Sequence, residues 1–285
     1  MIARDEEEVV GRALRSVAWA DEVVVVDGGS RDGTAAAAEE LGARVVRAGE
    51  WPGFPEQRRR ALEACAGPWI LVLDADEEVS PELAAEIRET LAGEGGSAGG
   101  RTPAGAAGAP SGPAGLFAGY EIPFHTRYLG HWFGRRGWHR ERHLRLARKD
   151  ALRVTGGRVH EGLAVDGPAG RLRHPIRHYT YRSLEQHHRK VGEYARLKAR
   201  ELHERGRSAT LASAVGHAAA ALFTGYVLRG RFLDGWAGLV RELLSAQAAL
   251  LAYLELRELD RRADDGPGSA PDEGGSAPDD GGSAP

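Results

Sequence analysis

The chain has very little sulfur and no marked excess of charge of either sign. Cys65 is the one cysteine among 285 residues, which excludes an internal disulfide and most metal sites built from cysteines. We expect Cys65 to act as a small apolar residue on a helix. The formal net charge of -3 gives no electrostatic reason to expect a nucleic-acid partner.

The start of the sequence also lacks an apolar leader. Residues 1–4 run directly into an acidic stretch at 5–8, without the hydrophobic segment of a signal peptide. We therefore expect a cytoplasmic protein. An apolar fraction of 42% is enough for a core, and the length suits one large α/β domain with additions, or two small domains.

Apolar runs typical of buried strands alternate with helical patterns over the first 91 residues. Strands are predicted at 2–3, 22–27, 44–46 and 69–73, and helices after Asp5, at 35–41, at about 55–66 and at 81–91. This alternation requires a parallel sheet with right-handed crossovers. The expected fold class is α/β, with a mostly parallel sheet flanked by helices. The strand at 2–3 looks like the end of a longer strand.

Four acidic residues follow the predicted strand at 69–73, where an open parallel sheet binds its ligand. Asp74 and Asp76 lie on the same side of an extended chain, at a spacing that lets them share one hard divalent cation. The plainer alternative is a solvated loop and an acidic helix start capped by Ser80. That alternative explains Glu77 and Glu78 well but Asp74 poorly, so we favour a metal site.

A glycine-rich turn follows the strand at 22–27. It has neither the ending of a P-loop nor the spacing of a dinucleotide fingerprint. Small residues such as Gly29 would let a ligand ring approach the backbone. Asp27 is placed to accept hydrogen bonds from a base or a ribose. A tight turn capped by Ser30 and Asp32 explains these last two residues equally well.

Several motifs occur in a fixed order along the chain. They are Asp5-Glu6-Glu7, Val-Val-Asp27-Gly-Gly-Ser30-Arg-Asp32-Gly-Thr34, Leu-Asp74-Ala-Asp76-Glu77, Trp51-Pro-Gly-Phe54, Gln57-Arg58, Tyr120-Glu-Ile-Pro123, Gly137-Trp138, Leu144-Arg145-Leu146, Val159-His160-Glu161 and His178-Tyr179. The first three resemble family-2 glycosyltransferases, which use nucleotide sugars and have the GT-A (Rossmann-like) fold. The others resemble bacterial lipopolysaccharide-core β-1,4-glucosyltransferases.

The sequence departs from this family pattern in four places. Asp5 stands where the family often has asparagine, and Arg59 where asparagine is expected after Gln57 and a basic residue. Glu141 replaces a usual aspartate, and Arg140 the proline before it. The short first strand leads us to expect either a start of translation upstream of Met1 or an incomplete nucleotide pocket.

The resemblance implies an inverting, metal-dependent transfer of a hexose, glucose from UDP-glucose, to a cell-envelope glycan or glycolipid. Mg²⁺ or Mn²⁺ would lie on the diphosphate, held by Asp74 and Asp76. His160 is a candidate metal ligand or diphosphate contact, although a single histidine is more often structural. The residues expected around the nucleotide are Asp5, Glu6, Asp27, Gly29, Ser30, Asp32, Gln57, Arg58 and Asp74.

An inverting transfer needs a carboxylate that takes the proton of the acceptor hydroxyl. Glu161 is the first candidate and Glu141 the second, with an ion pair to a neighbouring arginine as the alternative role of Glu161. Arg142 and Arg145, on one face of a strand, are candidates to bind the diphosphate or an anionic acceptor, together with Trp138.

The chain is expected to contain a transferase domain at 1–181, a helical extension at 182–262 and a disordered acidic tail at 263–285. Residues 93–115 are almost all small or proline and predict a disordered insert. Ser183 should cap a charged helix that ends near Arg205. The apolar helices at 209–250 either pack as ordinary core or contact the inner face of the cytoplasmic membrane.

Two other functions fit parts of the sequence. A strand ending in Asp-x-Asp also opens phosphatases that form an aspartyl-phosphate, but that motif normally lies on the first strand, and the later lysine and acidic pair are absent here. A non-catalytic nucleotide-sugar-binding protein would account for the short first strand and for Arg59.

Overall fold

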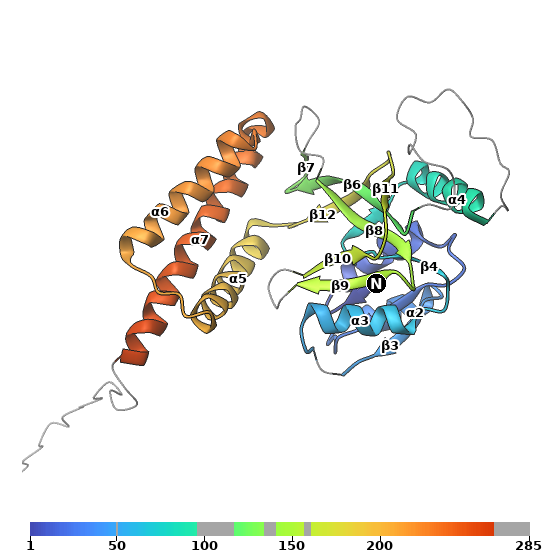
Figure 1. Cartoon of the computed structure of the whole chain (residues 1–285), viewed down its shortest axis with the longest axis horizontal. Coiled ribbons are helices and arrows are strands. Elements are labelled where there is room, and N and C mark those ends of the chain that lie inside the picture. Colours follow the sequence, from blue (N-terminus) through green and yellow to red (C-terminus); the bar gives the residue numbers. More distant parts are fainter. Residues whose placement is uncertain (50, 96–116, 134–140, 157–160, 265–285) are drawn as a thin grey trace, which may run out of the picture.

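The protein is described here by a computed structural model, which covers residues 1–49, 51–95, 117–133, 141–156 and 161–264. An α/β body forms one side of the molecule and a layer of long helices forms the other (Figure 1). Most of the predicted insert and tail, at 96–115 and 265–285, lies outside the described residues.

The first part of the body is a parallel sheet of three strands in the order β1-β2-β3. The strands are β1 (Ile2–Ala3), β2 (Val24–Asp27) and β3 (Arg44–Arg47), and the helices between them are α1 (Glu7–Ser16) and α2 (Thr34–Glu40). Every residue of β2 is buried, which explains its unbroken β-branched run. This part confirms the predicted alternation of strands and helices.

The next strand does not continue the parallel sheet. Helix α3 (Phe54–Ala64) leads to β4 (Trp69–Leu71), which pairs antiparallel with β8 (Arg142–Arg148). The prediction that the strand at 69–73 joins the parallel sheet is therefore wrong. The short β1 pairs only with the end of β2, and an apolar groove of about 480 Å³ separates β2 from β4.

The second sheet is mixed and has the order β4-β8-β6-β12-β5, with two further strands on β6. Its β6–β12 pairing is parallel, whereas β6–β8 and β12–β5 are antiparallel. The remaining bounds are β5 (Glu77–Val79), α4 (Pro81–Gly95), β6 (Gly119–Tyr128), β7 (His131–Trp132), β9 (Leu152–Gly156), β10 (Glu161–Val165), β11 (Ala169–Arg171) and β12 (Ile176–Thr180). Glu77 and Glu78, expected in a loop or a helix start, lie in β5.

The helical extension forms the other side of the molecule. Ser183 caps α5 (Leu184–Glu204) as predicted, since its hydroxyl accepts a hydrogen bond from the backbone N–H of Gln186 at 3.0 Å. The following segments are α6 (Leu211–Leu222), the π-helical turn η1 (Phe223–Leu228), the 3₁₀ turn η2 (Arg231–Asp234) and α7 (Gly235–Asp264). Helix α7 packs against both α5 and α6 (Figure 1).

The extension packs on the α/β body through aromatic side chains. Tyr128 and Phe133 form a buried cluster with Ala237 of α7. His187 of α5 stacks on Tyr181, with ring centres 3.9 Å apart, and its Nδ1 forms a hydrogen bond with the Tyr128 hydroxyl at 2.8 Å. Burial, reinforced by nearby positive charges, lowers the pKa of His187 to about 4.

The lowered pKa of His187 predicts a loss of stability in mild acid. An ordinary histidine pKa is 6.5, so the unfolded chain binds the proton first as the pH falls from 6.5 towards 4. Lowering the pH from 7.5 to 5 should reduce the free energy of unfolding by about 2 kcal/mol through His187. Urea denaturation should show that His187→Gln removes this part of the pH dependence. The exposed neighbour His188 provides the control, since His188→Gln should leave this part of the pH dependence in place. Equal effects of the two substitutions on the pH dependence would contradict the prediction.

Candidate active site

Polar side chains join the loops that follow β1 and β2. The Ser30 hydroxyl accepts a hydrogen bond from the Asp5 N–H at 3.0 Å, and Asp5 accepts one from the Arg31 N–H at 2.8 Å. Asp32 accepts a further bond from the Glu7 N–H at 3.2 Å. Asp5 has a φ of 55°, a left-handed conformation that asparagine and aspartate adopt more readily than most residues. The family's frequent asparagine at this position is thus replaced by a residue that tolerates the same backbone.

The Asp27 carboxylate mainly caps the turn that follows β2. Its carboxylate accepts hydrogen bonds from the backbone N–H groups of Gly29 and Ser30 and from the Ser30 hydroxyl. Gly29 has a φ of 83°, and a Cβ there would lie 2.4 Å from the Gly49 carbonyl oxygen, so this position requires glycine. The capped turn is therefore formed, and the nucleotide role of these residues stays a prediction.

Gln57 and Arg58 of α3 lie beneath this turn and not at its surface. They are 0% and 6% exposed. The Gln57 side-chain nitrogen has no hydrogen-bond partner within the described part of the chain, and a Cβ at Gly28 would lie 3.0 Å from it. Gln57 thus packs under Gly28, whereas Arg58 donates to Asp74 and lines the groove between β2 and β4. The nucleotide role of the two side chains stays a prediction.

A buried cluster of two acids and two arginines surrounds Asp74. Arg58 and Arg145 donate to its two carboxylate oxygens at 3.1 and 3.0 Å, and Arg145 also reaches Glu77 at 2.6 Å. Burial alone would raise the pKa of Asp74, but the two arginines outweigh it and hold the pKa well below its usual range. Burial raises the pKa of Glu77 to about 7, although Arg145 partly offsets it.

Asp74 and Asp76 therefore have different partners. Both oxygens of Asp74 are held by arginines, whereas Asp76 lies 3.3 Å from the Nε2 of His178. The expectation that one cation is shared by both aspartates does not fit this arrangement, because Asp74 is already neutralised. Arg145, expected to bind a diphosphate or an acceptor, is instead buried with Asp74 and Glu77.

Asp76 faces a pocket of about 240 Å³ between the α/β body and α5. Burial opposes the protonation of His178, but the contact with Asp76 and the nearby acids raise its pKa overall. Burial and the charge of Asp76 raise the pKa of Glu6. The charged and polar residues that line the pocket are Glu6, Asp76, His178, Tyr179, Thr180, Tyr181, Arg182, Gln186, Lys190 and Tyr194.

The contribution of α5 to this pocket was missed in the sequence analysis. Gln186, Lys190 and Tyr194 are spaced four residues apart, which places them on one face of the helix, and Arg182 precedes them by another four. That spacing is visible in the sequence, but spacing alone does not show that this face of the helix borders the pocket.

The acidic and imidazole groups of this pocket suit a divalent cation that is bound together with a ligand. Among the described residues, no three His, Cys, Asp or Glu side chains are gathered closely enough to hold a metal ion. Mg²⁺ is commonly bound by one or two carboxylates, with substrate phosphates and water completing its coordination. Asp76, with a side chain 35% exposed and one ion-pair partner, fits this pattern, and His178 lies beside it.

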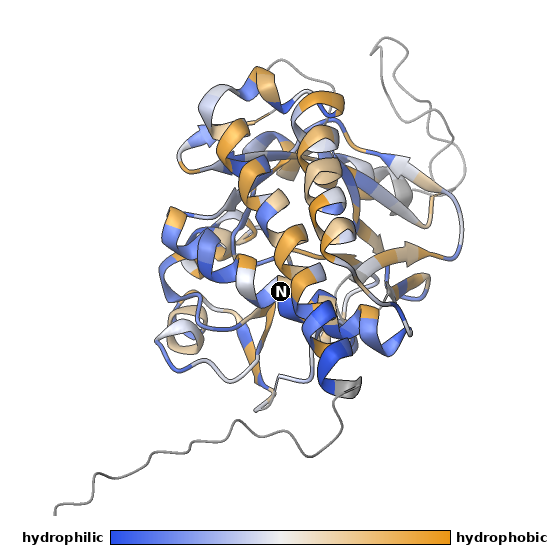
Figure 2. Cartoon of the chain, turned by 90° about the vertical axis from the view of Figure 1, so that its left-hand side faces the viewer, coloured by the Kyte–Doolittle hydropathy of each residue, from blue (hydrophilic) through white to orange (hydrophobic). Residues whose placement is uncertain are grey.

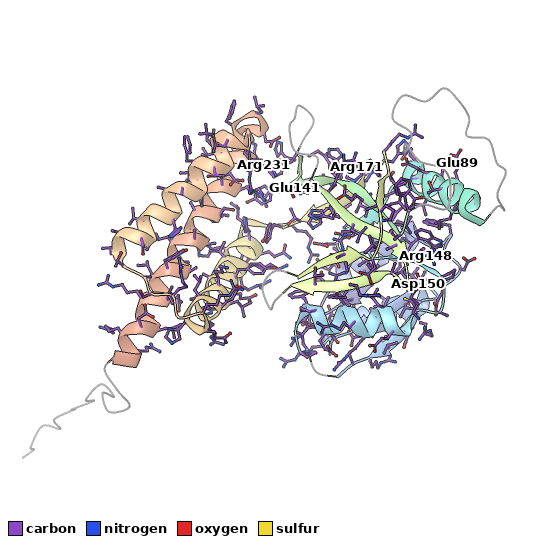
Figure 3. The ribbon with its side chains drawn as sticks, viewed as in Figure 1. Glu89, Glu141, Arg148, Asp150, Arg171 and Arg231 are labelled. Carbon is purple, nitrogen blue, oxygen red and sulfur yellow. The ribbon has the colours of Figure 1, made fainter. Side chains whose placement is uncertain are left out.

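The predicted acceptor residues are only partly described. Glu141 precedes β8 and lies 3.9 Å from Arg231 of η2 (Figure 3), and Arg142 donates to the Leu172 carbonyl at 2.8 Å. Glu161 begins β10 opposite Gly156. The side chain of Glu161, together with His160 and Trp138, lies outside the described part of the structure.

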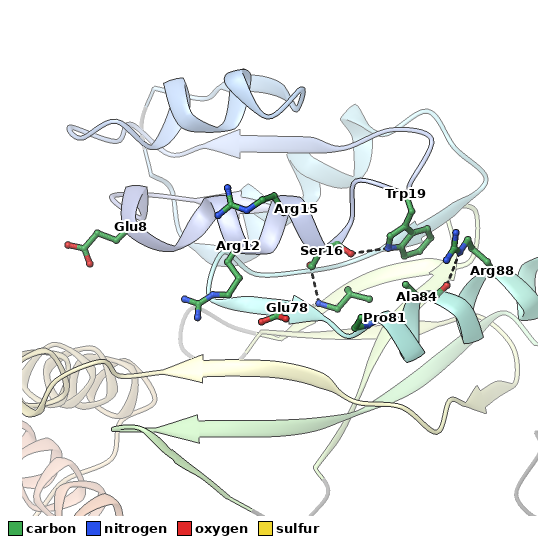
Figure 4. A pocket seen from close by; sticks show the side chains of 10 residues that line it. Glu8, Arg12, Arg15, Ser16, Trp19, Glu78, Pro81, Ala84 and Arg88 are labelled. Carbon is green, nitrogen blue, oxygen red and sulfur yellow. Dashed lines mark hydrogen bonds between the residues drawn. The ribbon is translucent and has the colours of Figure 1, made fainter.

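A larger groove of about 680 Å³ lies on another side of α1, against α4 (Figure 4). Arg12, Arg15 and Arg88 line it together with Trp19, whose indole N–H donates to the Ser16 carbonyl at 2.9 Å. Neither Asp76 nor the loops after β1 and β2 contribute to this groove. The smaller pocket, which Asp76 and Glu6 line, is therefore the candidate active site.

An α/β fold with polar side chains after β1 and β2 is typical of enzymes that bind their ligands at the carboxyl ends of parallel strands. The sequence model of "Glycosyl transferase family 2" matches residues 1–156, more than half of the chain. The chain belongs to glycosyl transferase family 2 and is a glycosyltransferase. Its fold is of the predicted α/β GT-A class with a C-terminal helical extension, although the second sheet is mixed and not mostly parallel.

Several known proteins are similar over different lengths. The lipopolysaccharide core biosynthesis glycosyltransferase LpsC of Rhizobium meliloti (strain 1021) is 27% identical, over 73% of this chain and 72% of LpsC. The uncharacterized glycosyltransferase RT0209 of Rickettsia typhi is 27% identical, over 92% of this chain and 87% of RT0209. A TPR repeat-containing protein of Synechococcus elongatus is 47% identical, but this chain spans only 23% of that protein's length.

Solved structures show a weaker likeness. Glucosyl-3-phosphoglycerate synthase from Mycobacterium tuberculosis, in complex with Mn²⁺, UDP-glucose and phosphoglyceric acid, is 28% identical with a TM-score of 0.29. The match covers 32% of this chain and 37% of that one. A TM-score this low carries no argument. The phosphatase alternative fails on the site itself, since its nucleophile would be Asp74, which two arginines hold.

The buried cluster predicts unequal effects of two arginine substitutions on β8. Arg145→Gln should lower the free energy of unfolding by about 3–5 kcal/mol, because it leaves the buried Glu77 without its arginine and Asp74 with Arg58 alone. Arg148→Gln on the same strand should cost less than about 1 kcal/mol, since its ion pair with Asp150 is exposed. Chemical denaturation of both variants would test this, and similar losses would show that Arg145 does not stabilise the site.

Proposed function

We propose that this enzyme transfers a hexose, glucose from UDP-glucose, with inversion, to a lipopolysaccharide-core or related cell-envelope glycan acceptor. The observation that carries the proposal is the pocket in which Asp76 and His178 face Arg182 and Lys190. A nucleoside diphosphate requires both a cation-binding carboxylate and fixed positive charges around its phosphates. The similarity to LpsC supports the acceptor class, and the resemblance to core β-1,4-glucosyltransferases supports glucose.

Each part of the pocket has a separate role in this proposal. Asp76 would hold Mg²⁺ or Mn²⁺ with His178 beside it, and the chemistry such a cation supplies when bound is to offset negative charge on a departing diphosphate. Lys190 and Arg182 bind phosphate oxygens from the α5 side. The nucleoside lies on the joined loops after β1 and β2, where Asp5 and Ser30 are within reach of the solvent.

The reaction needs a base on the acceptor side. The acceptor hydroxyl oxygen forms a bond to the anomeric carbon while the bond from that carbon to the diphosphate oxygen breaks, and a carboxylate takes the hydroxyl proton. Glu161 remains the first candidate because Glu141 already lies near Arg231. His160 would contact the diphosphate or the cation, and Trp138 the acceptor.

The metal role of Asp76 predicts a loss of both metal binding and turnover. In Asp76→Asn, release of UDP from UDP-glucose with Mn²⁺ should fall at least about 100-fold, because charge on the leaving group is no longer offset. Calorimetry should show weaker binding of Mn²⁺ with UDP. The control is Asp150→Asn, at a carboxylate side chain that is 68% exposed. It should leave both UDP release and Mn²⁺ binding unchanged. Full turnover in EDTA, or in Asp76→Asn, would contradict the proposal.

The assignment of the base predicts different effects for two glutamates. Glu161→Gln should lower kcat by about 10²–10⁴-fold, since the amide cannot take a proton, while UDP binding stays unchanged. Glu141→Gln should keep most of the activity. Steady-state kinetics with a lipopolysaccharide-core acceptor would measure both variants. The opposite order of effects would transfer the role of base to Glu141.

A further inference from the structure

Helix α6 and the turn η1 form an apolar segment that the protein leaves uncovered. Leu211–Leu228 contains no charged residue, and only 11% of it is buried. Leu211, Val215, Phe223 and Val227 fall on one face at intervals of four or eight residues, and each is 47–56% exposed. Ordinary core packing, the alternative considered from the sequence, therefore does not account for these side chains.

The exposed apolar surface continues past the end of η1. Figure 2 shows hydrophobic residues along both front helices of the extension. We define the apolar stripe as the exposed large side chains of α6, η1, η2 and the start of α7: Leu211, Val215, Phe223, Val227, Leu228, Phe232, Leu233, Trp236, Leu239 and Leu243.

A helix that is apolar on most sides needs cover from a protein core or from lipid. Helix α7 covers one side of α6, and the other sides remain open. A lipid surface would cover the exposed side chains of α6, η1, η2 and the start of α7 together, because it needs no matching side chains on a partner. The uncharged composition of α6 and η1 thus favours a lipid surface over a second protein.

The charges at the two ends of the apolar segment also argue against a second copy of this chain. Arg205 and Arg207 precede α6, and Arg229 follows η1; all three are exposed. A two-fold antiparallel pairing of two α6 helices would bring the arginines of one end against those of the other. Anionic lipid headgroups instead attract both ends.

The helix lies on such a surface and does not cross it. Helix α7 packs against α5, whose sequence is charged along its whole length, so a spanning α6 would draw α5 towards the hydrocarbon. The C-terminal end of the apolar segment is held on the α/β body, because the Arg231 guanidinium of η2 lies 4.9 Å from the centre of the Phe133 ring. Both constraints keep α6 parallel to the membrane plane.

We infer that the apolar stripe binds the surface of an anionic lipid bilayer and holds the enzyme there. The stripe enters the interface, and the arginines at its ends contact anionic headgroups. This inference is independent of the donor and the acceptor proposed above, because none of the residues in the stripe lines the active-site pocket.

Co-sedimentation of the full chain with lipid vesicles would test the inference. The wild type should bind vesicles of phosphatidylcholine and phosphatidylglycerol, and bind pure phosphatidylcholine more weakly. Phe223→Glu and Val215→Glu should each weaken binding by about tenfold or more, since they place a charge in the lipid interface. Leu41→Glu, at a similarly exposed leucine of the α/β body, should bind as the wild type does.

A second readout does not depend on the folding of a charged variant. Brominated lipids should quench the fluorescence of the wild type, and Trp236→Phe should remove most of this quenching because Trp236 lies in the stripe. Sedimentation velocity would detect a dimer, which would form if a second copy of this chain covered the stripe. A wild type that stays unbound with all vesicles, or a dimer that Phe223→Glu separates without any vesicle binding, would overturn the inference.

Discussion

The arrangement of the active site depends on one buried guanidinium. Arg145 of β8 connects Asp74, which follows β4, with Glu77 of β5, and Arg58 of α3 completes the cluster. The Phe124 ring lies 5.1 Å from the same guanidinium. Three stretches of the chain, at Arg58, at 74–77 and at Arg145, are thereby held together around two carboxylates that would be costly to bury alone. Because this cluster neutralises Asp74 and Glu77, Asp76 remains as the acidic group of the turn that faces the pocket.

The pocket is formed jointly by the α/β body and the helical extension. Arg182 and Lys190 come from the start of the extension, and the contacts of His187 with Tyr128 and Tyr181 hold α5 in place. In the proposed site the body supplies Asp76 and Glu6, and the positive charges come from Arg182, which precedes α5, and from Lys190 of α5.

The sequence predicted what local patterns determine and missed what distant contacts determine. Strand β2, the Ser183 cap and the helices flanking the first sheet follow from apolar periodicity and capping residues within a few positions. The pairing of β4 with β8 and the partners of Asp74 depend on residues about seventy positions away, such as Arg145. Two aspartates spaced two residues apart do not reveal that one of them forms an ion pair with an arginine from another strand.

The inferred membrane surface and the proposed acceptor are consistent with each other. The stripe includes the start of α7, and α7 packs directly against α5, which lines the pocket. An enzyme held on lipid through the stripe would therefore carry its pocket about one helix layer from the bilayer, since packed helix axes lie about 8–10 Å apart. That position suits an acceptor that is itself anchored in the bilayer, as both a glycolipid and a lipopolysaccharide-core glycan are.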